Sequence, residues 1–238
     1  MKYNKGAIIG YSGFIGANIY DQCKEKFKDL DLFNTSNVHE ITTSKYDLVF
    51  CSALPAVKWV ANKEPNKDKK NTLCLIKYLK RLKTKIFVLI STIDVHFEHP
   101  YGENRLFLEK FVKKNFKNYY IIRLPGVFGN GLKKNIIYDL IHNKNLKNIF
   151  SNDFFQWYDL SLIGKDLIKL LKENKKGTIE LYSEPIGNDE ILKFFKKKNQ
   201  LKRIREKPVI YRFKPIMGYF NSKKYILSRI KMFIKNYK

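Results

Sequence analysis

The sequence has few of the features that mark secreted, metal-binding or membrane-spanning proteins. Its 238 residues include three cysteines, Cys23, Cys51 and Cys74, an odd number without CxxC spacing. Neither a disulfide framework nor a zinc site is therefore expected, and the thiols should be free and mostly buried. No apolar run approaches the roughly 20 residues that a membrane-spanning helix needs. The N-terminus MKYNKGAIIG passes directly into a short strand-like run, unlike a signal peptide, so we expect a cytoplasmic protein.

Acidic residues are scarce as well, with 22 Asp and Glu against 47 Lys and Arg and a net charge of +25. Such a charge suggests a nucleic-acid partner, because basic side chains neutralise phosphates. However, the basic residues are 40 Lys and only 7 Arg, beside 21 Asn. This bias is typical of AT-rich coding, and Arg is the better reader of phosphates and bases. We therefore expect a solvated, Lys-rich surface and no specific nucleic-acid partner.

The apolar residues follow an alternating pattern of strands and helices. With 44% apolar and 15% aromatic residues, the chain can bury a sizeable core. Apolar runs bounded by turn residues predict strands at 7–10, 30–33, 47–52, 86–91, 119–124 and 178–182, and apolar spacings of three or four predict helices at 16–28, 71–82, 101–115, 160–173 and 189–197. This alternation predicts an α/β fold, a doubly wound parallel sheet that binds ligands at the carboxyl ends of its strands.

The first strand-like run ends in a glycine-rich turn. Residues 10–16 read Gly-Tyr-Ser-Gly-Phe-Ile-Gly, and an amphipathic stretch follows. In such a turn Gly10 reverses the chain, Gly13 lets a pyrophosphate approach the backbone, and Gly16 lets the helix pack against the strand. The helix N-terminus then faces the phosphates. The pattern predicts a dinucleotide-binding site, with a purely structural turn as the alternative.

The residue about twenty positions beyond this turn bears on the choice of dinucleotide. An acid at that point would accept hydrogen bonds from the adenosine ribose of NAD, whereas this chain has Asn34. A neutral side chain does not repel a 2′-phosphate, so NADP is mildly favoured over NAD. Asp31 would serve instead if the strand ended early, and no Arg stands in residues 31–37 to bind the phosphate.

Three later segments carry motifs of one enzyme superfamily. Residues 46–53 read Tyr-Asp-Leu-Val-Phe-Cys-Ser-Ala, residues 90–96 read Ile-Ser-Thr-Ile-Asp-Val-His, and residues 123–129 read Arg-Leu-Pro-Gly-Val-Phe-Gly. Together with the glycine turn they resemble the extended short-chain dehydrogenase/reductase superfamily, in particular its NAD-dependent epimerase/dehydratase family of nucleotide-sugar enzymes. The resemblance covers Lys5 to about Leu132, returns more loosely at 154–162 and 184–195, and implies a Rossmann-type core.

The resemblance also implies catalytic residues. In the superfamily a Ser or Thr polarises the reacting sugar oxygen and a Tyr exchanges a proton with it, while a Lys four residues later lowers the Tyr pKa and holds the nicotinamide ribose. The matching positions are Thr92, Tyr101 and Arg105, so Arg replaces the usual Lys. Arg105 shares a helix face with Tyr101 and keeps a positive charge beside the phenol, but it is too basic to relay protons. We expect Arg105→Lys to retain or raise activity.

The same resemblance separates the possible reactions. Dehydratases of the superfamily carry Thr-Asp-Glu where this chain has Thr-Ile-Asp at 92–94, so the position of the general acid is apolar. Dehydration is therefore not expected, and reduction or epimerisation remains. His96 and His99 are interpreted as loop residues, and no metal is expected because no third ligand is near.

The C-terminal part is expected to form a small substrate lobe. We place the dinucleotide-binding core at residues 1–129 and the lobe at 130–238, with a sheet-completing segment near 178–182. Lys133, Lys134 and Asn135 form a polar loop that suits the diphosphate of a nucleotide-activated sugar. Gln156 is a candidate sugar or phosphate contact, with an ordinary amphipathic strand as the alternative. Since the lobe is short for the superfamily, either the sugar is poorly enclosed or a partner subunit, as in a homodimer, completes the site.

The last 46 residues are strongly basic, with 16 Lys and Arg against Glu206 alone. Residues 222–237 predict a basic amphipathic helix whose apolar stripe consists of Tyr225, Ile226, Ile230, Phe233 and Ile234. Two interpretations remain open: the helix closes the substrate lobe, or it lies on an anionic membrane surface.

The sequence thus predicts an NAD(P)-dependent oxidoreductase or epimerase that acts on a nucleotide-activated sugar for surface polysaccharide synthesis. A catalytically silent NAD(P)-binding regulator is the alternative, favoured by Arg105, and a nucleic-acid-binding module is supported only by the charge. By resemblance, the cofactor contacts are Gly10, Ser12, Gly13, Phe14, Ile15, Gly16, Asn34, Ser52, Ala53, Leu54, Tyr101, Arg105 and Leu124. The substrate contacts are Thr92, Asn135 and Gln156.

Overall fold

The structure is a computed structural model that describes residues 2–195 and 203–237. The chain divides into two compact units, Met1–Arg123 with Leu162–Ile179, and Leu124–Ser161 with Glu180–Lys238. This division differs from the expected boundary between residues 129 and 130, because the chain returns to the first unit for one more helix and strand. The returning helix packs closely there: the Gly164 N–H donates to Gln22 Oε1 at 2.9 Å.

The first unit is built on a six-stranded sheet with the order β2-β1-β3-β4-β5-β9. Its strands are β1 (Tyr3–Ile9), β2 (Phe27–Phe33), β3 (Lys45–Cys51), β4 (Lys83–Thr92), β5 (Tyr119–Leu124) and β9 (Gly177–Glu180). β1 pairs in parallel with β2 and with β3, and β3 pairs in parallel with β4. All six predicted strands are present, and the predicted α/β doubly wound fold of Rossmann type is confirmed.

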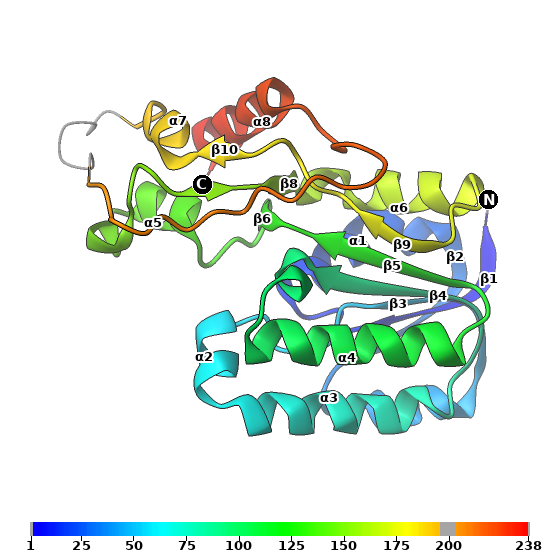
Figure 1. Cartoon of the computed structure of the whole chain (residues 1–238). Helices are drawn as coiled ribbons and strands as arrows, with labels where there is room; N and C mark the ends of the chain where they lie inside the picture. The colour runs from blue at the N-terminus through cyan, green and yellow to red at the C-terminus, as the bar shows by residue number, and fades with distance from the viewer. Residues whose placement is uncertain (1, 196–202, 238) are drawn as a thin grey trace. The chain divides into compact units, whose positions relative to one another are not determined.

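Helices cover both faces of this sheet (Figure 1). They are α1 (Phe14–Cys23), α2 (Lys58–Lys63), α3 (Pro65–Leu79), α4 (Pro100–Asn115) and α6 (Ile163–Lys172). On the α3 and α4 side, Ile9 and Val49 of the sheet pack in one buried cluster with Leu79 and Val112. Helix α1 ends earlier than the predicted 16–28 helix, because a 3₁₀ turn leads into β2, where the Phe27 ring stacks on Tyr3 at 5.5 Å.

The second unit contains two small sheets and three helices among the residues that the structure describes. β6 (Gly126–Phe128) pairs in parallel with β8 (Trp157–Asp159), and β7 (Phe154–Phe155) pairs antiparallel with β10 (Ile186–Gly187). The helices are α5 (Ile136–His142), α7 (Asn188–Leu192) and α8 (Lys223–Asn236). The helix predicted at 189–197 corresponds to α7, and its last two residues lie outside the described ranges.

Helix α8 buries its apolar stripe within the second unit. Ile226 and Ile230 are fully buried, and the Phe233 ring lies 5.6 Å from that of Phe128. On the flank of the helix, Arg229 Nε donates to Asp159 Oδ2 at 2.7 Å. Of the two interpretations of this helix, packing on the second unit agrees with these contacts, since the centre of the stripe is already covered.

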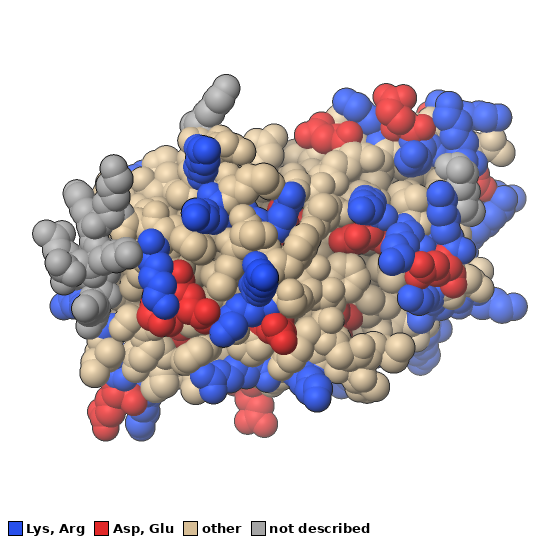
Figure 2. Space-filling view, turned by 90° about the horizontal axis from the view of Figure 1, so that it is seen from above, with Lys and Arg blue, Asp and Glu red and all other residues tan. Residues whose placement is uncertain are grey.

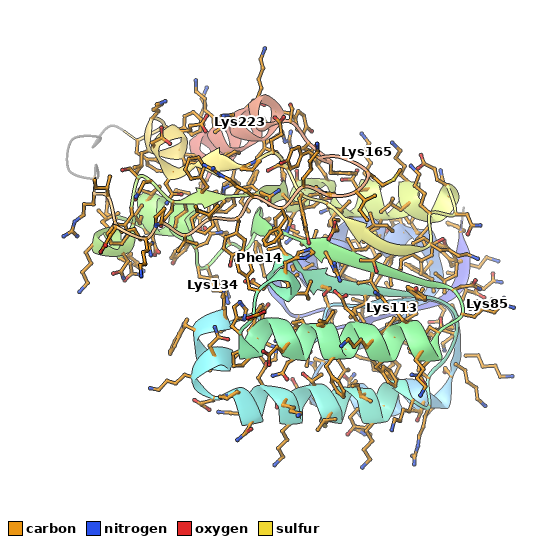
Figure 3. The ribbon with its side chains drawn as sticks, viewed as in Figure 1. Phe14, Lys85, Lys113, Lys134, Lys165 and Lys223 are labelled. Atoms are coloured by element: carbon orange, nitrogen blue, oxygen red, sulfur yellow. The ribbon has the colours of Figure 1, made fainter. Side chains whose placement is uncertain are left out.

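Basic side chains on the surface are interspersed with acidic ones. Figure 2 shows Lys and Arg spread over one face of the molecule with Asp and Glu between them. Lys223, labelled in Figure 3, is an example, since its Nζ lies 3.3 Å from Glu190 Oε1 and its backbone N–H donates to Glu184 at 2.7 Å. This distribution favours the solvated-surface interpretation of the charge.

The three cysteines are free: Cys23 and Cys51 are buried and Cys74 is exposed. Across residues 2–195 and 203–237, no cluster of three or more His, Cys, Asp and Glu side chains is suited to a metal ion. In the same part of the chain, none of the helices combines the length and hydropathy required for crossing a membrane.

Candidate active site

The glycine turn joins β1 to α1 and remains open on one side. Gly10 has a φ of +84°, which favours glycine, and the Gly13 N–H donates to the Gly10 carbonyl at 3.0 Å. A Cβ on Gly16 would lie 2.0 Å from the Gly10 oxygen, so only glycine allows the helix to approach this closely. A Cβ on Gly13 would meet only the Gly10 oxygen, at 3.3 Å, and both Ser12 and Gly13 are exposed. The turn therefore has the shape that a pyrophosphate requires.

Asn34 directly follows β2, which ends at Phe33. Its Oδ1 accepts hydrogen bonds from the backbone N–H of Ser36 at 2.8 Å and from the Ser36 hydroxyl at 2.6 Å. Asp31 lies within the strand, where its Oδ2 accepts a hydrogen bond from the Tyr46 hydroxyl at 2.9 Å. The strand therefore does not end early, and Asn34 is the first residue after β2, as the sequence predicted.

The loop after β3 carries backbone strain. Leu54 has a φ of +103°, a conformation that a bulky side chain rarely adopts. Ser52 is tied to the glycine turn, because its N–H donates to the Ile9 carbonyl at 2.9 Å and its hydroxyl lies 3.4 Å from the Gly10 oxygen. Ser52, Ala53 and Leu54 thus follow β3 as the resemblance implies, beside Gly10. Strain of this kind concentrates at functional sites.

Thr92 is the last residue of β4 and caps the 3₁₀ turn η3 (Ile93–His96). Its Oγ1 accepts from the Asp94 N–H at 3.1 Å and donates to Asp94 Oδ2 at 3.2 Å. The other carboxylate oxygen of Asp94 lies 2.6 Å from Lys58 Nζ and 3.3 Å from His99 Nε2. The Thr92 hydroxyl is therefore hydrogen-bonded to a carboxylate that itself forms an ion pair with Lys58.

His99 is the N-cap of α4 and lies just outside the helix, as expected of a loop residue, whereas His96 is the last residue of the 3₁₀ turn η3. The Nδ1 of His99 accepts the Gly102 N–H at 3.0 Å, so the imidazole proton is assigned to Nε2, facing Asp94. The next residue, Pro100, occupies the first helical position, where its missing N–H costs nothing. A Cβ on Gly102 would lie 2.2 Å from the Asp94 carbonyl, so the helix start packs tightly on η3. Tyr101 is thereby brought next to the turn that Thr92 caps.

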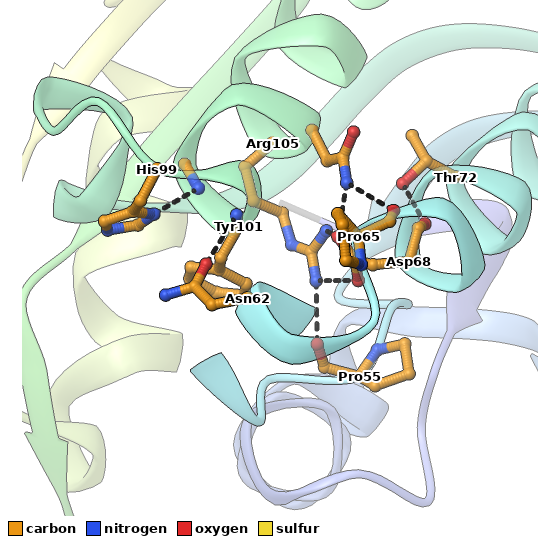
Figure 4. Close-up of polar contacts among 10 residues, drawn as sticks. Pro55, Asn62, Pro65, Asp68, Thr72, His99, Tyr101 and Arg105 are labelled. Carbon is orange, nitrogen blue, oxygen red and sulfur yellow. Dashed lines mark hydrogen bonds and ion pairs between the residues drawn. The ribbon is translucent and has the colours of Figure 1, made fainter. Parts of the chain in front are cut away.

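Tyr101 is buried, and its backbone N–H donates to Asn62 Oδ1 at 3.0 Å (Figure 4). Burial raises the pKa of its hydroxyl above the usual value, and Asp94 and Asp68 act in the same direction. Arg105 opposes this shift, by its charge and by a hydrogen bond to the phenol. On balance the phenol is protonated near neutral pH.

Arg105 is placed differently from the cofactor contact that the resemblance implies. It is buried, and its Nη1 and Nη2 bind the two carboxylate oxygens of Asp68 at 3.0 and 3.1 Å. Nη2 also donates to the Pro55 carbonyl at 2.7 Å, and the guanidinium carbon lies 4.4 Å from the centre of the Tyr101 ring (Figure 4). Its charge is thus paired with Asp68, while the guanidinium still lies beside the Tyr101 ring as the sequence predicted.

A second buried ion pair lies one turn further along α4. Glu109, with no exposed surface, binds Arg123 through Nη2 at 2.7 Å and Nε at 3.0 Å, and accepts the Ser91 hydroxyl at 2.6 Å. Glu109 thus ties α4 to two neighbouring strands of the sheet, β4 through Ser91 and β5 through Arg123. Leu124, the final residue of β5, is buried and falls in the second unit.

The two substrate contacts predicted in the second unit are engaged in structural hydrogen bonds. Asn135 is the N-cap of α5, where Oδ1 accepts from Ile137 and Tyr138 and Nδ2 donates to the Val127 carbonyl. Gln156 is 1% exposed. Its Nε2 donates to the carbonyls of Ser183 and Phe213 at 2.7 and 2.8 Å, and its Oε1 accepts the Phe213 N–H. Backbone partners thus occupy both amides in this structure, and the two substrate contacts stay predictions.

Solved structures with a similar fold were identified by comparison. UDP-N-acetylglucosamine 4-epimerase from Methanobrevibacter ruminantium M1, in complex with UDP-N-acetylmuramic acid, is 16% identical, with a TM-score of 0.71 over 99% of this chain and 98% of that one. The dTDP-4-dehydrorhamnose reductase of Bacillus anthracis, in complex with NADP, is 16% identical, with a TM-score of 0.71 over 98% and 99%. The enzyme WbmG of Bordetella bronchiseptica, in complex with NAD, is 13% identical, with a TM-score of 0.68 over 93% and 84%.

The chain shares the fold of these proteins. No protein-family model and no curated protein matches its sequence.

Within this epimerase/reductase fold, the sequence reasoning missed Asp68, Lys58 and the position of Asp94. Asp68 lies in a run of polar residues, Asn-Lys-Asp-Lys-Lys-Asn at 66–71, where nothing distinguishes it from its solvated neighbours. Lys58 is one of 40 lysines. Asp94 lies in the 92–94 motif, and a charged residue two positions after Thr92 was the one feature of the sequence that could have indicated its contact with Thr92.

Proposed function

We propose that this chain is an NAD(P)-dependent oxidoreductase or epimerase that acts on a nucleotide-activated sugar. The observation that carries the proposal is the linkage of Thr92 to the start of α4 through Asp94 and His99, which holds the helix turn that carries Tyr101 beside the turn that Thr92 caps. Parallel strands present their carboxyl ends at one edge of a sheet, and β1, with its open glycine turn, shares that edge with β4. A hydroxyl pair beside a dinucleotide turn is the arrangement that redox chemistry on a sugar requires.

The residues of the turn fit a dinucleotide. The space at Gly13 that a Cβ would occupy is open, and the N-terminus of the ten-residue helix α1 begins at the next residue. Asn34 and the Ser36 hydroxyl present neutral groups after β2, which supports NADP at least as well as NAD. The dinucleotide would supply reversible hydride transfer, and the chain's own groups would bind and orient it.

In the proposed mechanism, Tyr101 donates a proton to the reacting sugar oxygen in reduction, and Thr92 accepts one from it in oxidation. Burial keeps the Tyr101 phenol protonated, so in carbonyl reduction it can donate its proton. In the oxidative direction, Thr92 Oγ1 can accept the proton of the sugar hydroxyl while its own proton passes to the Asp94 carboxylate, to which it already donates a hydrogen bond. Lys58 and His99 hold Asp94 for both steps.

Dehydration is disfavoured by the burial of Ile93. That side chain stands where dehydratases carry their general acid, and it is 2% exposed. An apolar, buried group cannot protonate a leaving hydroxyl. Reduction or epimerisation is therefore the better-supported chemistry.

The proposal extends to partners and setting. Lys133 and Lys134 are the basic groups suited to a sugar diphosphate, and partial burial lowers the pKa of Lys134. We further propose a cytoplasmic enzyme of surface polysaccharide synthesis, active as a homodimer, with no specific nucleic-acid partner. We also propose peripheral contact with a membrane through the basic side chains of the C-terminal segment. The apolar stripe of α8 would take no part in it, because Ile226 and Ile230 are buried within the second unit.

A catalytically silent NAD(P)-binding regulator is the second candidate. The observation that favours it is the pairing of Arg105 with Asp68, which removes the usual Lys contact to the cofactor. Such a regulator would bind the dinucleotide and turn over no sugar.

Thermal unfolding in the presence of NAD, NADP and a panel of nucleotide sugars tests both candidates, because ligands that bind only the folded state raise its stability. Sugars that stabilise the protein would then be assayed for turnover with the parent and with Tyr101→Phe. An enzyme predicts stabilisation by a dinucleotide and by at least one nucleotide sugar, with turnover that Tyr101→Phe removes. Stabilisation by a dinucleotide alone, without turnover, would support the regulator.

A further inference from the structure

Asp68 is a buried acid with no role in the mechanism above. It lies in the first turn of α3 and is 4% exposed, yet it forms three side-chain hydrogen bonds. Two come from Arg105, and the third comes from Asn104 Nδ2 at 2.9 Å (Figure 4). Its neighbours Lys67, Lys69 and Lys70 are exposed, so the local sequence gives no reason for a buried charge at this position.

Arg105 connects Asp68 to both parts of the candidate site. Its guanidinium binds the carbonyl of Pro55, next to strained Leu54 in the loop after β3, and it lies over the ring of Tyr101. Three of its five N–H groups point at oxygens of Asp68 and Pro55, and the guanidinium carbon lies 4.4 Å from the centre of the Tyr101 ring. A guanidinium held in this way is fixed on Asp68 and Pro55, and the paired carboxylate offsets part of its charge.

We propose that Asp68 is a positioning residue that acts through Arg105: it fixes the Tyr101 ring and the Pro55 carbonyl in place and offsets part of the charge that Arg105 would otherwise present to the Tyr101 hydroxyl. The inference deepens the proposed function, on which it rests. Its consequence is that Tyr101 stays a neutral phenol and donates a proton, which suits carbonyl reduction. With Asp68 neutralised, Arg105 would instead stabilise the phenolate.

The charged and titratable groups that face Tyr101 come from three elements. Arg105 lies on its own helix, Asp68 on α3, and Asp94 on η3, where Lys58 of α2 pairs with it. The His99 ring lies 6.2 Å from that of Tyr101. Among these groups, Asp68 and Arg105 are joined in a bidentate pair, so removal of one exposes the full charge of the other.

The second unit contains a matched arrangement that serves as a control. Arg205 lies 4.3 Å from the centre of the Phe150 ring and forms an ion pair with Asp153, which is 2% exposed. This arrangement repeats the aromatic ring, arginine and buried aspartate of the candidate site, but its ring belongs to Phe150, which has no hydroxyl to titrate. Asp153→Asn therefore disturbs a similar ion pair without touching the candidate site.

The test is an NMR pH titration of the full chain labelled with [ζ-¹³C]tyrosine, in which Tyr101→Phe identifies the signal of Tyr101. We expect Asp68→Asn to lower the titration midpoint of Tyr101 by about one pH unit or more, the size expected when an opposite charge within a few ångströms is no longer offset. Arg105→Gln should raise the midpoint. The double variant should return close to the parent, and Asp153→Asn should leave it unchanged. An Asp68→Asn midpoint equal to or above the parent's would overturn the proposal.

A second comparison covers the case in which Asp68→Asn does not fold. Removal of Asp68 can then be measured in the Arg105→Gln background, where the double variant should titrate below the single one, and equal midpoints would overturn the proposal. The titration needs no substrate, so it is independent of the proposed function. If turnover is found, Asp68→Asn should also move the high-pH limb of the kcat profile for reduction to lower pH, an effect that a purely structural role does not predict.

Discussion

The ammonium group of Lys58 lies 2.6 Å from a carboxylate oxygen of Asp94, whose other oxygen lies 3.2 Å from the Thr92 hydroxyl. Lys58 comes from α2 and Asp94 from η3, so the ion pair joins the segment after β3 to the segment after β4. Lys58 also lies 5.4 Å from the centre of the Phe97 ring. In this chain a lysine from α2 therefore stands close to Thr92, whereas Arg105 of α4 is paired elsewhere.

Loss of Lys58 should impair turnover more than stability. Lys58→Met removes the cation that holds Asp94, so we expect kcat to fall by up to about 100-fold through misplacement of Thr92. The melting temperature should change little, because Lys58 is partly exposed and such pairs contribute little to folding. Lys85→Met, which breaks the exposed pair with Asp47, is the control for kinetics and melting. Equal kcat values for the two variants would contradict this role of Lys58.

Gly13→Val should abolish dinucleotide binding and leave the fold intact. The new Cβ would meet only the Gly10 oxygen, at 3.3 Å, and the side chain would fill the space that the pyrophosphate needs. Gly16→Ala should instead lower stability by roughly 1–3 kcal/mol, because its Cβ would clash with the Gly10 oxygen at 2.0 Å. Calorimetric titration with NAD and NADP, beside thermal unfolding, distinguishes the two effects. Unchanged affinity in Gly13→Val would show that the turn is not the cofactor site.

Asn34 should make the protein tolerant of NADP. In titrations of both cofactors at fixed salt, we expect NADP to bind as tightly as NAD or more tightly. Asn34→Asp should shift the preference toward NAD, since the new carboxylate would repel a 2′-phosphate. NAD binding more than tenfold tighter in the parent, or ~1.4 kcal/mol, would refute the assignment.

Tyr101→Phe should remove most turnover and leave cofactor affinity nearly unchanged, because the hydroxyl acts on the transition state. The structure reverses the expectation for Arg105→Lys. A single ammonium cannot reproduce the two contacts with Asp68 and the one with Pro55, so this variant should lose both stability and activity. Thermal unfolding and steady-state kinetics of both variants provide the check, and an Arg105→Lys protein at least as active as the parent would contradict the geometry.

The buried thiols should make stability fall at alkaline pH. Burial raises the pKa of Cys23 to about 11 and that of Cys51 to about 12, above the roughly 8.5 of an unfolded thiol. A thiol whose pKa is higher in the folded than in the unfolded protein contributes its full stabilisation at pH values below the unfolded-state pKa. This stabilisation is lost as the pH rises through the folded-state pKa. Melting temperatures should therefore fall from about pH 9 upward, and more shallowly in Cys51→Ala.

Alkylation checks the same thiols directly. With iodoacetamide at pH 8, exposed Cys74 should be labelled in the native protein, and all three cysteines should be labelled after denaturation. Native labelling of Cys51 would show that this part of the sheet opens to solvent.

The sequence by itself determined the features that depend on short stretches of chain. The alternation of apolar runs and amphipathic stretches specified the six strands, because hydrophobic burial acts on the local period of the side chains. Gly10, Gly13 and Gly16 specified the open turn after β1, since each meets a steric requirement within seven residues. Thr92 and Tyr101 were found as candidates because they belong to motifs with a fixed spacing.

Only the tertiary structure decided which charges meet. Asp68 and Arg105 are separated by 37 residues, and Gln156 binds backbone groups 27 and 57 residues away. A buried polar side chain must find partners, but these come from whichever elements the fold brings beside it, and no local pattern names them. The exposed lysines around Asp68 and the amphipathic strand around Gln156 are compatible with several partners. Folding selected Arg105 and Asn104 for Asp68, and Ser183 and Phe213 for Gln156, and it paired Arg105 with an acid that its motif does not contain.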